Sequence, residues 1–325
     1  AHLDFDYLHG LALSDSGHRV LDRIEDDRAR LLRRERLPEP GEYMELRLKP
    51  PRGARHPAGA GAVAGAGAAA VESTITLVLR SDLAPASMDT FIEIFRDGAH
   101  TAVAGFAELA GEHPHTVVDL GANEGYYTLL MKLLNPGVRI VAAEPIAENV
   151  DLFRRNVEAN GLHDVSCVEA AVTAPGRITA ADATPGAITL DTYPHVGTVA
   201  STDIAAFPRP WIDPTRVRRR RVEAITLPAL LDQAGVSEAD ILKVDVEGSE
   251  VDVLSGAAEA WTVSRTPTVP RMPTEAEVLR RFRRIVVECH GTEKRELVLA
   301  VLERADFACV HIEGKRSGDV YAERR

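Results

Sequence analysis

Cysteine is scarce in this chain of 325 residues, which contains only three. Cys167, Cys289 and Cys309 are far apart and form no C-x-x-C pair, so the sequence indicates neither a disulfide framework nor a zinc site. The chain also lacks an apolar run near the ~20 residues that a membrane helix needs. Its first residues lack the basic and apolar regions of a signal peptide. We therefore expect reduced thiols in a cytoplasmic protein that does not contact membranes.

Basic residues are in deficit, since 38 Lys and Arg stand against 49 Asp and Glu, a formal net charge of −11. This acidic balance argues against a general nucleic-acid binder and fits a small neutral or cationic ligand better. Hydrophobic residues make up 45% and charged residues 27%, which excludes collagen-like and wholly disordered chains. The expected partner is a small molecule, with no nucleic acid.

Residues 1–110 are expected to form an N-terminal extension. Apolar residues at helical spacing predict a helix over 14–36, and one or two more helices are expected over 87–110. Two strand patterns, at 42–49 and 74–80, predict a hairpin around the Ala- and Gly-rich loop 57–70. A homodimer formed through this extension is one expectation that follows.

From residue 111 onward, strands alternate with helices, which predicts an α/β domain over 111–325. Such βαβ units form a mostly parallel sheet with helices on both faces. The expected strands are 116–121, 139–143, 165–170, 241–246, 284–289, 307–312 and 319–322, and the expected helices are 126–134, 147–160, 249–261 and 293–305. A long proline-rich insert, 173–221, is our candidate for a lid over a bound acceptor.

The strongest local motif is Asp-Leu-Gly-Ala-Asn-Glu-Gly-Tyr, residues 119–126, which follows the first strand of this domain. Gly121 and Gly125 permit a tight turn and a close backbone approach, where part of a nucleotide can lie against a helix N-terminus. The dinucleotide fingerprint G-x-G-x-x-G is not present, and an ordinary strand-to-helix turn would also explain the glycines. Glu144, followed by Pro145, ends the next strand about 20 positions later, where an acid can accept ribose hydroxyls.

Charged residues also gather at a later strand end. Lys243, Asp245 and Glu247 alternate along it and therefore share one side, where buried charge must be paired or bind something polar. A structural ion pair at the turn is the alternative. A divalent metal on Asp245 and Glu247 is chemically conceivable, but nothing in the sequence demands one and we expect none. His290 follows the next strand, beside Glu288, and suits proton removal from a hydroxyl, although a hydrogen-bonded rim histidine explains it equally well.

Together these motifs resemble the FkbM-type S-adenosylmethionine-dependent methyltransferases. The resemblance rests on residues 119–126, on Glu144-Pro145, on the Lys-Val-Asp-Val-Glu-Gly-Ser-Glu block within 241–256, and on Val-Val-Glu-Cys-His at 286–290. It covers about residue 81 to the C-terminus, with Pro228 and Ala229 standing where the family usually has acidic residues. It implies a seven-stranded Rossmann-like sheet, S-adenosyl-L-methionine as cofactor, and methyl transfer to an oxygen of a small-molecule acceptor, often a sugar or natural product.

On this basis we predict a cofactor site and a catalytic group. The cofactor site comprises Asp119, Gly121, Asn123, Gly125, Tyr126, Glu144, Pro145, Glu169, Ala170, Ala171 and Asp245. The catalytic group comprises Lys243, Asp245, Glu247 and His290, in which Asp245 orients the acceptor and His290 takes its proton. A carboxylate acceptor would need no base. An NAD(P)-dependent oxidoreductase and a non-catalytic Rossmann-like binding module are the alternative functions.

Overall fold

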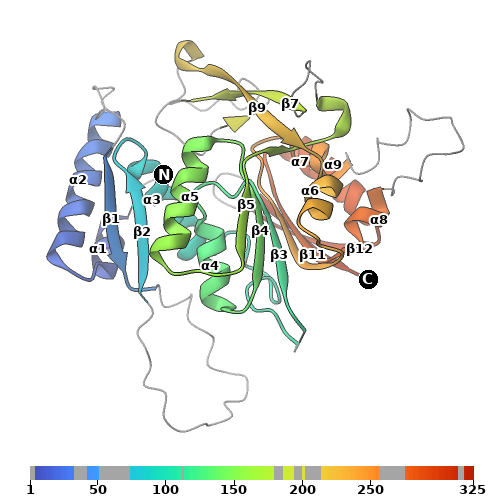
Figure 1. Cartoon of the computed structure of the whole chain (residues 1–325), viewed down its shortest axis with the longest axis horizontal. Coiled ribbons are helices and arrows are strands. Elements are labelled where there is room, and N and C mark those ends of the chain that lie inside the picture. Colours follow the sequence, from blue (N-terminus) through green and yellow to red (C-terminus); the bar gives the residue numbers. More distant parts are fainter. Residues whose placement is uncertain are drawn as a thin grey trace, which may run out of the picture.

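The computed structural model describes residues 4–32, 42–50, 74–111, 113–178, 186–193, 200–201, 214–255, 275–313 and 318–325. A seven-stranded sheet lies at the centre of the molecule (Figure 1). Its strands are, in spatial order, β12 (Phe307–Glu313), β13 (Gly318–Arg324), β11 (Phe282–Cys289), β10 (Ala239–Val244), β3 (Thr116–Leu120), β4 (Arg139–Ala143) and β5 (Val165–Val168). Strand β13 runs antiparallel to both neighbours, whereas the other pairs are parallel. The mostly parallel, seven-stranded Rossmann-like sheet is therefore confirmed.

The central strands are buried on both faces, which explains why they are continuous runs of aliphatic residues. Val117 and Ile241 belong to one hydrophobic cluster, whereas their neighbours Val118 and Leu242 belong to the cluster on the other face. The helices of this domain are α4 (Tyr126–Leu134), α5 (Ala147–Ala159), α6 (Leu227–Gln233), α7 (Glu250–Ser255), α8 (Glu275–Leu279) and α9 (Thr292–Arg304). Helix α4 packs into the first cluster and α6 to α9 into the second, so helices cover both faces as predicted.

Helices α6 and α8 of this domain were not predicted. At the start of α6, the Thr226 hydroxyl accepts a hydrogen bond from the Ala229 amide, and Pro228 stands in the first turn, where its missing N–H costs nothing. Of the helix predicted over 249–261, residues 250–255 form α7 and residues 256–261 lie outside the described part of the chain.

The N-terminal extension packs against the first face of the sheet. It consists of α1 (Phe5–Leu11), α2 (Asp15–Leu32), β1 (Tyr43–Leu48), β2 (Ile75–Arg80) and α3 (Ala84–Phe95), with β1 and β2 paired as the predicted antiparallel hairpin. The loop predicted over 57–70 lies outside the described residues. Of the helices predicted over 87–110, the first is α3, which begins three residues earlier at Ala84, where Pro85 suits a first turn; after Phe95 the chain continues as turns.

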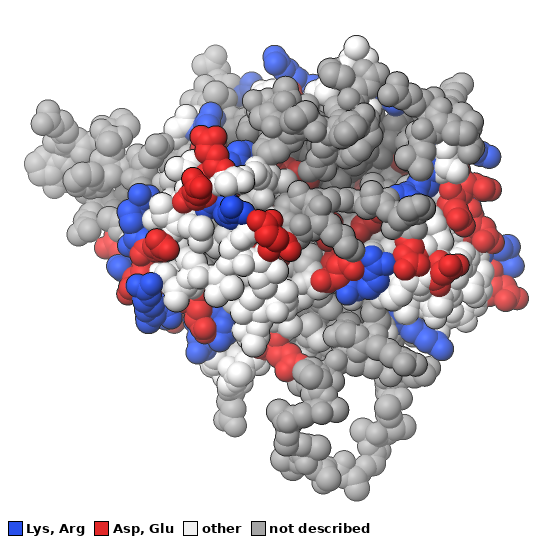
Figure 2. Space-filling view, turned by 180° about the vertical axis from the view of Figure 1, so that it is seen from behind, with Lys and Arg blue, Asp and Glu red and all other residues white. Residues whose placement is uncertain are grey.

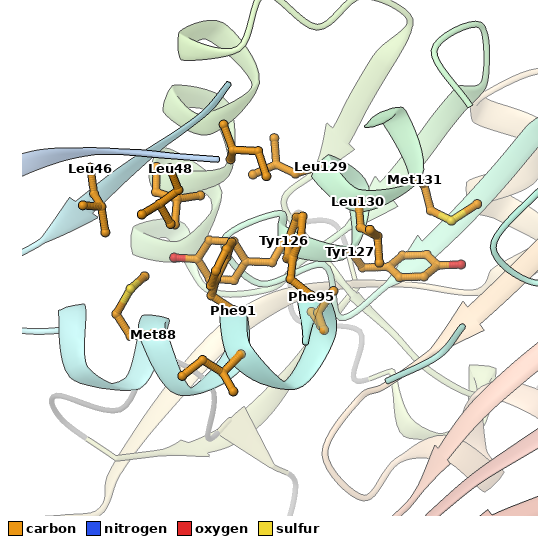
Figure 3. Packing of buried hydrophobic residues seen from close by; sticks show 14 of the residues in the cluster. Leu46, Leu48, Met88, Phe91, Phe95, Tyr126, Tyr127, Leu129, Leu130 and Met131 are labelled. Carbon is orange, nitrogen blue, oxygen red and sulfur yellow. The ribbon is translucent and has the colours of Figure 1, made fainter. Parts of the chain in front are cut away.

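One hydrophobic core joins this extension to the sheet domain. Leu46 and Leu48 of β1, and Met88, Phe91 and Phe95 of α3, pack around Tyr126 of α4 (Figure 3). The rings of Phe91 and Tyr126 meet edge to face with centroids 6.2 Å apart. Polar contacts add to this packing, since the side-chain oxygen of Asn156 in α5 accepts a hydrogen bond from the Val78 amide of β2 at 2.7 Å.

Described residues of the insert predicted as a lid, 173–221, form a small sheet together with residues 171–172 before it and 222–225 after it. Strands β6 (Ala171–Val172), β9 (Arg218–Ile225), β7 (Ala187–Thr192) and β8 (Ala200–Ser201) form it in that spatial order, with one-turn helices at Pro175–Arg177 and Pro214–Arg216. Ile188 and Leu190 alternate inward and are buried, whereas the four arginines 218–221 are exposed. This period-two alternation was hidden by the prolines and threonines around it, and residues 179–185, 194–199 and 202–213 lie outside the described chain.

No helix within the described residues is both long enough and apolar enough to cross a membrane. The face shown in Figure 2 carries acidic and basic side chains interspersed among other residues.

Candidate active site

A pocket lies where the carboxyl ends of the parallel strands meet the small insert sheet. In open α/β sheets this edge is where ligands bind. The sheet domain contributes Gly121, Asn123, Glu144, Pro145, Asn149, Ala170, Asp245, Glu247, Glu288 and His290; β6 and β7 contribute Ala171, Val172, Ile188 and Leu190, and α3 contributes Thr90 and Glu93. Ile188 and Leu190, which belong to the insert 173–221, therefore form part of the pocket wall.

The floor of the pocket is the turn after β3. Gly121 has a φ of +71°, and a Cβ at this position would lie 1.7 Å from the backbone oxygen of Asp245. Only glycine permits this approach, which brings the turn after β3 against the end of β10. The next residue but one, Asn123, also has a positive φ of +50°. Asparagine tolerates this conformation better than most residues.

Glu144 holds the turn from the side. Its carboxylate accepts hydrogen bonds from the amides of Asn123 and Ile146, both at 3.0 Å, and from the Asn149 side chain at 3.1 Å. The residue is only 5% exposed, and this burial raises the pKa of Glu144 to about 7 despite the three hydrogen bonds. A carboxylate has about four acceptor positions, so one more hydrogen bond, as from a ribose hydroxyl, can be accommodated.

Lys243 lies beneath the turn. Its Nζ donates to the backbone oxygens of Leu120 at 3.3 Å and Gly121 at 2.8 Å, and it lies 3.3 Å from Asp119 and 3.5 Å from Asp245. Burial opposes the ammonium charge, but the two carboxylates outweigh it and raise the pKa of Lys243. Lys243 thus forms the structural ion pair that was the alternative to a role in the site. Its partner Asp245 lines the pocket.

His290 is the centre of a carboxylate cluster. Its Nδ1 donates to Glu250 at 2.8 Å, and its Nε2 lies 3.3 Å from Glu247 and 3.6 Å from Glu288. Burial lowers the pKa of His290, but the hydrogen bond to Glu250 and the charge of Glu247 dominate and raise it to about 10. The imidazole therefore already carries its proton at neutral pH, whereas the predicted role of His290 as the base needs a neutral imidazole.

Two more groups complete the cluster. Burial and the negative charge of Asp245 raise the pKa of Glu288 to about 8. Asp245 behaves oppositely: burial would raise its pKa, yet Lys243, His100 and His290 lower it. The two neighbouring acids are thus held in different protonation states at neutral pH, which is the usual mark of an acid–base pair in an active site.

Several predicted residues do not line this pocket. Asp119 is buried behind it and accepts a hydrogen bond from Thr128 at 2.9 Å. Gly125 begins α4 at a φ of +89°, where a Cβ would meet the Phe153 ring at 2.8 Å, and Tyr126 turns its side chain into the core, where its hydroxyl donates to Glu124. Glu169 borders a separate depression with Arg220.

Other members of the site were not predicted from the sequence. Glu288 was noted only as a neighbour of His290, and Asn149, although part of the resemblance region, carried no assigned role. Glu250, which orients His290, is the last residue of the Lys-Val-Asp-Val-Glu-Gly-Ser-Glu block, so that block contained the signal. Ile188 of the insert carried a weaker signal, a brief alternation that was hidden by its surroundings.

A comparison with protein-family models decides the family. The model described as the methyltransferase FkbM domain matches residues 119–309. The chain belongs to the FkbM methyltransferase family. The predicted membership is confirmed.

Three curated relatives are similar in sequence to part of this FkbM chain. Methyltransferase 1 of Beauveria bassiana is 34% identical over 151 residues, which cover 43% of this chain and 57% of that protein. Methyltransferase sdnD of Sordaria araneosa is 26% identical over 178 residues, or 47% of this chain and 64% of that protein. The AMB antimetabolite synthetase AmbE of Pseudomonas aeruginosa is 28% identical over 202 residues, which are 55% of this chain and only 8% of that protein. The chain thus spans less than two thirds of these relatives.

Solved structures with a related fold are more distant. The methyltransferase domain of METTL16 has a TM-score of 0.40 and 11% identity, with 74% of this FkbM chain and 79% of that chain covered. The precorrin-6y C5,15-methyltransferase of Geobacter metallireducens has a TM-score of 0.35 and 14% identity, with 65% and 81% covered.

Proposed function

We propose that this FkbM-family protein transfers a methyl group from S-adenosyl-L-methionine to a hydroxyl oxygen of a small molecule, such as a sugar or a natural-product intermediate. The observation that carries the proposal is the pocket at the strand ends, in which Glu144, Asp245 and Glu288 converge above the glycine turn. The name of one relative, an antimetabolite synthetase, supports a natural-product acceptor.

The described pocket suits the cofactor in three respects. Asn123 lines the pocket, and within the described chain its buried Oδ1 has no hydrogen-bond partner, so it is an acceptor available to a ligand. Glu144 has a remaining acceptor position for a ribose hydroxyl. Ile188 and Leu190 supply an apolar wall for a base, and the acidic side chains suit a cationic sulfonium.

The charge of the pocket favours a hydroxyl acceptor over a carboxylate. Five carboxyl side chains line it: Glu93, Glu144, Asp245, Glu247 and Glu288. Asp245 among them is ionised, so placing an anionic acceptor beside it would bring like charges together where water is partly excluded, which is costly. A neutral hydroxyl meets no such repulsion, and it needs a base.

We assign the base to Glu288 rather than to His290. S-adenosyl-L-methionine, when bound, supplies an electrophilic methyl group on sulfur. As the acceptor oxygen takes this methyl group, its proton passes to the Glu288 carboxylate, which becomes a carboxylic acid. The pKa of Glu288, about 8, lies near working pH, whereas His290 is already protonated and can hold the acceptor by donating a hydrogen bond. Asp245 stays ionised and orients the hydroxyl, as predicted from the sequence.

Calorimetry and mass spectrometry test this proposal. Calorimetry should show binding of S-adenosyl-L-methionine and none of NAD; binding of NAD alone would restore the oxidoreductase alternative, and binding of neither cofactor in the folded protein would favour the non-catalytic module.

The acceptor class is tested by incubating the protein with cofactor and paired acceptors that differ only in bearing a hydroxyl or a carboxyl group. Mass spectrometry should find an alkali-stable methyl ether on the hydroxyl member. An alkali-labile methyl ester on the carboxyl member would contradict the acceptor class. Glu288→Gln, which keeps the side-chain shape and cannot ionise, tests the base: it should bind cofactor normally and lose ether formation.

A further inference from the structure

His100 reaches the carboxylate cluster from outside the family domain. It lies in the turns that follow α3, before residue 119, where the family match begins. Its side chain is 3% exposed, so a polar ring is fully enclosed between the extension and the sheet. Its backbone has a φ of +64°, a conformation that costs a non-glycine residue free energy and is kept only where the surroundings enforce it.

The contacts of His100 join three strands of the sheet. Its backbone amide donates to Asp319 of β13 at 2.8 Å, and its Nδ1 lies 3.3 Å from the other oxygen of the same carboxylate. On the opposite side, Nε2 lies 3.8 Å from both Asp245 and Glu288. One ring therefore faces the two pocket acids to which the proposed function gives the orienting and base roles.

We propose that His100 is a positioning residue for methyl transfer, an imidazolium supplied by the N-terminal extension that fixes the place and charge of Asp245 and Glu288 beside the pocket. The inference rests on the proposed function, because it concerns the same two acids. His100 itself does not line the described pocket, so it acts through them and not on the acceptor.

The charges around His100 favour its protonated form. Asp319, Asp245 and Glu288 face it, and the cation Lys243 opposes them from β10; the ring of Tyr127 packs edge-on against the imidazole, and the Tyr321 hydroxyl donates to Asp319. Burial lowers the pKa of His100, but Asp319 outweighs this effect and raises it to about 9. Glu288 in turn faces Asp245, His290, His100 and Glu93. Loss of the His100 charge therefore leaves Glu288 with one fewer cation beside it.

Two substitutions separate charge from backbone strain. His100→Asn and His100→Gly both remove the imidazolium, and both residues accept a positive φ more readily than histidine does. An opposite charge this close lowers the pKa of an acid by about 1 to 3, so either variant should raise the pKa of Glu288 by about 1 or more. At a pH below that pKa, turnover should therefore fall about 10-fold or more, and it should recover as the pH rises. The matched control is His115→Asn, which replaces a histidine that pairs with Asp240 near the amino end of β10, away from the pocket. It should not change the dependence of turnover on pH.

The decisive measurement is the pKa of the Glu288 carboxyl group. Infrared spectroscopy follows its carboxylate band through a pH titration, and the band is assigned to Glu288 because it is missing from Glu288→Gln. A raised titration in both His100 variants supports the inference. If turnover does not follow that titration, Glu288 is not the base and only the proposed function fails. An unchanged pKa of Glu288 in both variants overturns the inference. So does nitrogen NMR that finds His100 neutral at pH 7 in the unmodified protein, and this second test remains valid even if neither variant folds. Added imidazole should restore turnover at neutral pH in His100→Gly, whereas a purely structural defect would not respond.

Discussion

Gly121→Ala should damage this protein far more than Gly161→Ala, although both add one methyl group at a positive φ. Gly161 follows α5 with a φ of +58° and has no atom within 4 Å of an added Cβ. Gly121 has a φ of +71°, but its added Cβ would lie 1.7 Å from the backbone oxygen of Asp245. The pair therefore separates the cost of the backbone conformation from the cost of the collision.

The magnitudes follow from these distances. The left-handed conformation costs alanine about 1 to 2 kcal/mol, and Gly161→Ala should lose only that amount of unfolding free energy, with methyl transfer unchanged. For Gly121→Ala the contact must open from 1.7 Å to at least 3.0 Å, a movement that displaces Asp245, which lines the pocket. A misplacement of about 1 Å can cost about 10²-fold in rate, and we expect a fall of this order in kcat/KM.

Urea denaturation and a methyl-transfer assay measure the two effects. A Gly121→Ala variant that equals Gly161→Ala in both stability and kcat/KM would refute the reasoning, because it would mean that the turn after β3 and the end of β10 do not need this close approach.

Three further predictions concern the pocket. Glu144→Ala should weaken S-adenosyl-L-methionine binding by about 1.5 to 3 kcal/mol, because it removes a hydrogen-bonded charged group, and calorimetry on the folded variant would expose an unchanged affinity. The rate should rise with pH through about 8, since Glu288 must lose its proton to act as base. Glu288→Gln should abolish this rise and lower kcat about 10²- to 10⁴-fold. A rise near pH 6.5 that disappears in His290→Ala would instead assign the base to His290. Dialysis against EDTA should leave turnover unchanged, and a loss restored by added Mg²⁺ would indicate a metal on Asp245 and Glu247.

The fold was largely predictable because its signals are local. Alternating strand and helix patterns predicted the parallel sheet, and glycine at position 121 marked the turn after β3 before the structure showed the reason, the approach of Asp245. Residues at successive strand ends were correctly expected to share one edge, so Glu144, Asp245 and His290 all line the pocket.

The remaining features depend on distance in space. His100 lies more than a hundred positions from its partners, and no sequence period links it to them. The pKa of His290 depends on Glu247 and Glu250, whose orientation is set by the turn around Gly248 and by burial. Tyr126 was misplaced because a helix start next to a glycine motif does not show which way its first side chain turns.

The segment that matches the family model is shorter than the length of chain that shares one sheet and one hydrophobic core. An expression fragment cut to residues 119–309 would lose β13 and residues 310–313 of β12, and would leave β11 with an unpaired edge. It would also lose Phe91 and Leu46, uncovering the face that Tyr126 and Leu129 present to the extension. Apolar patches and open edges of this kind promote aggregation, so fragments of this protein need to include both α1 and β13.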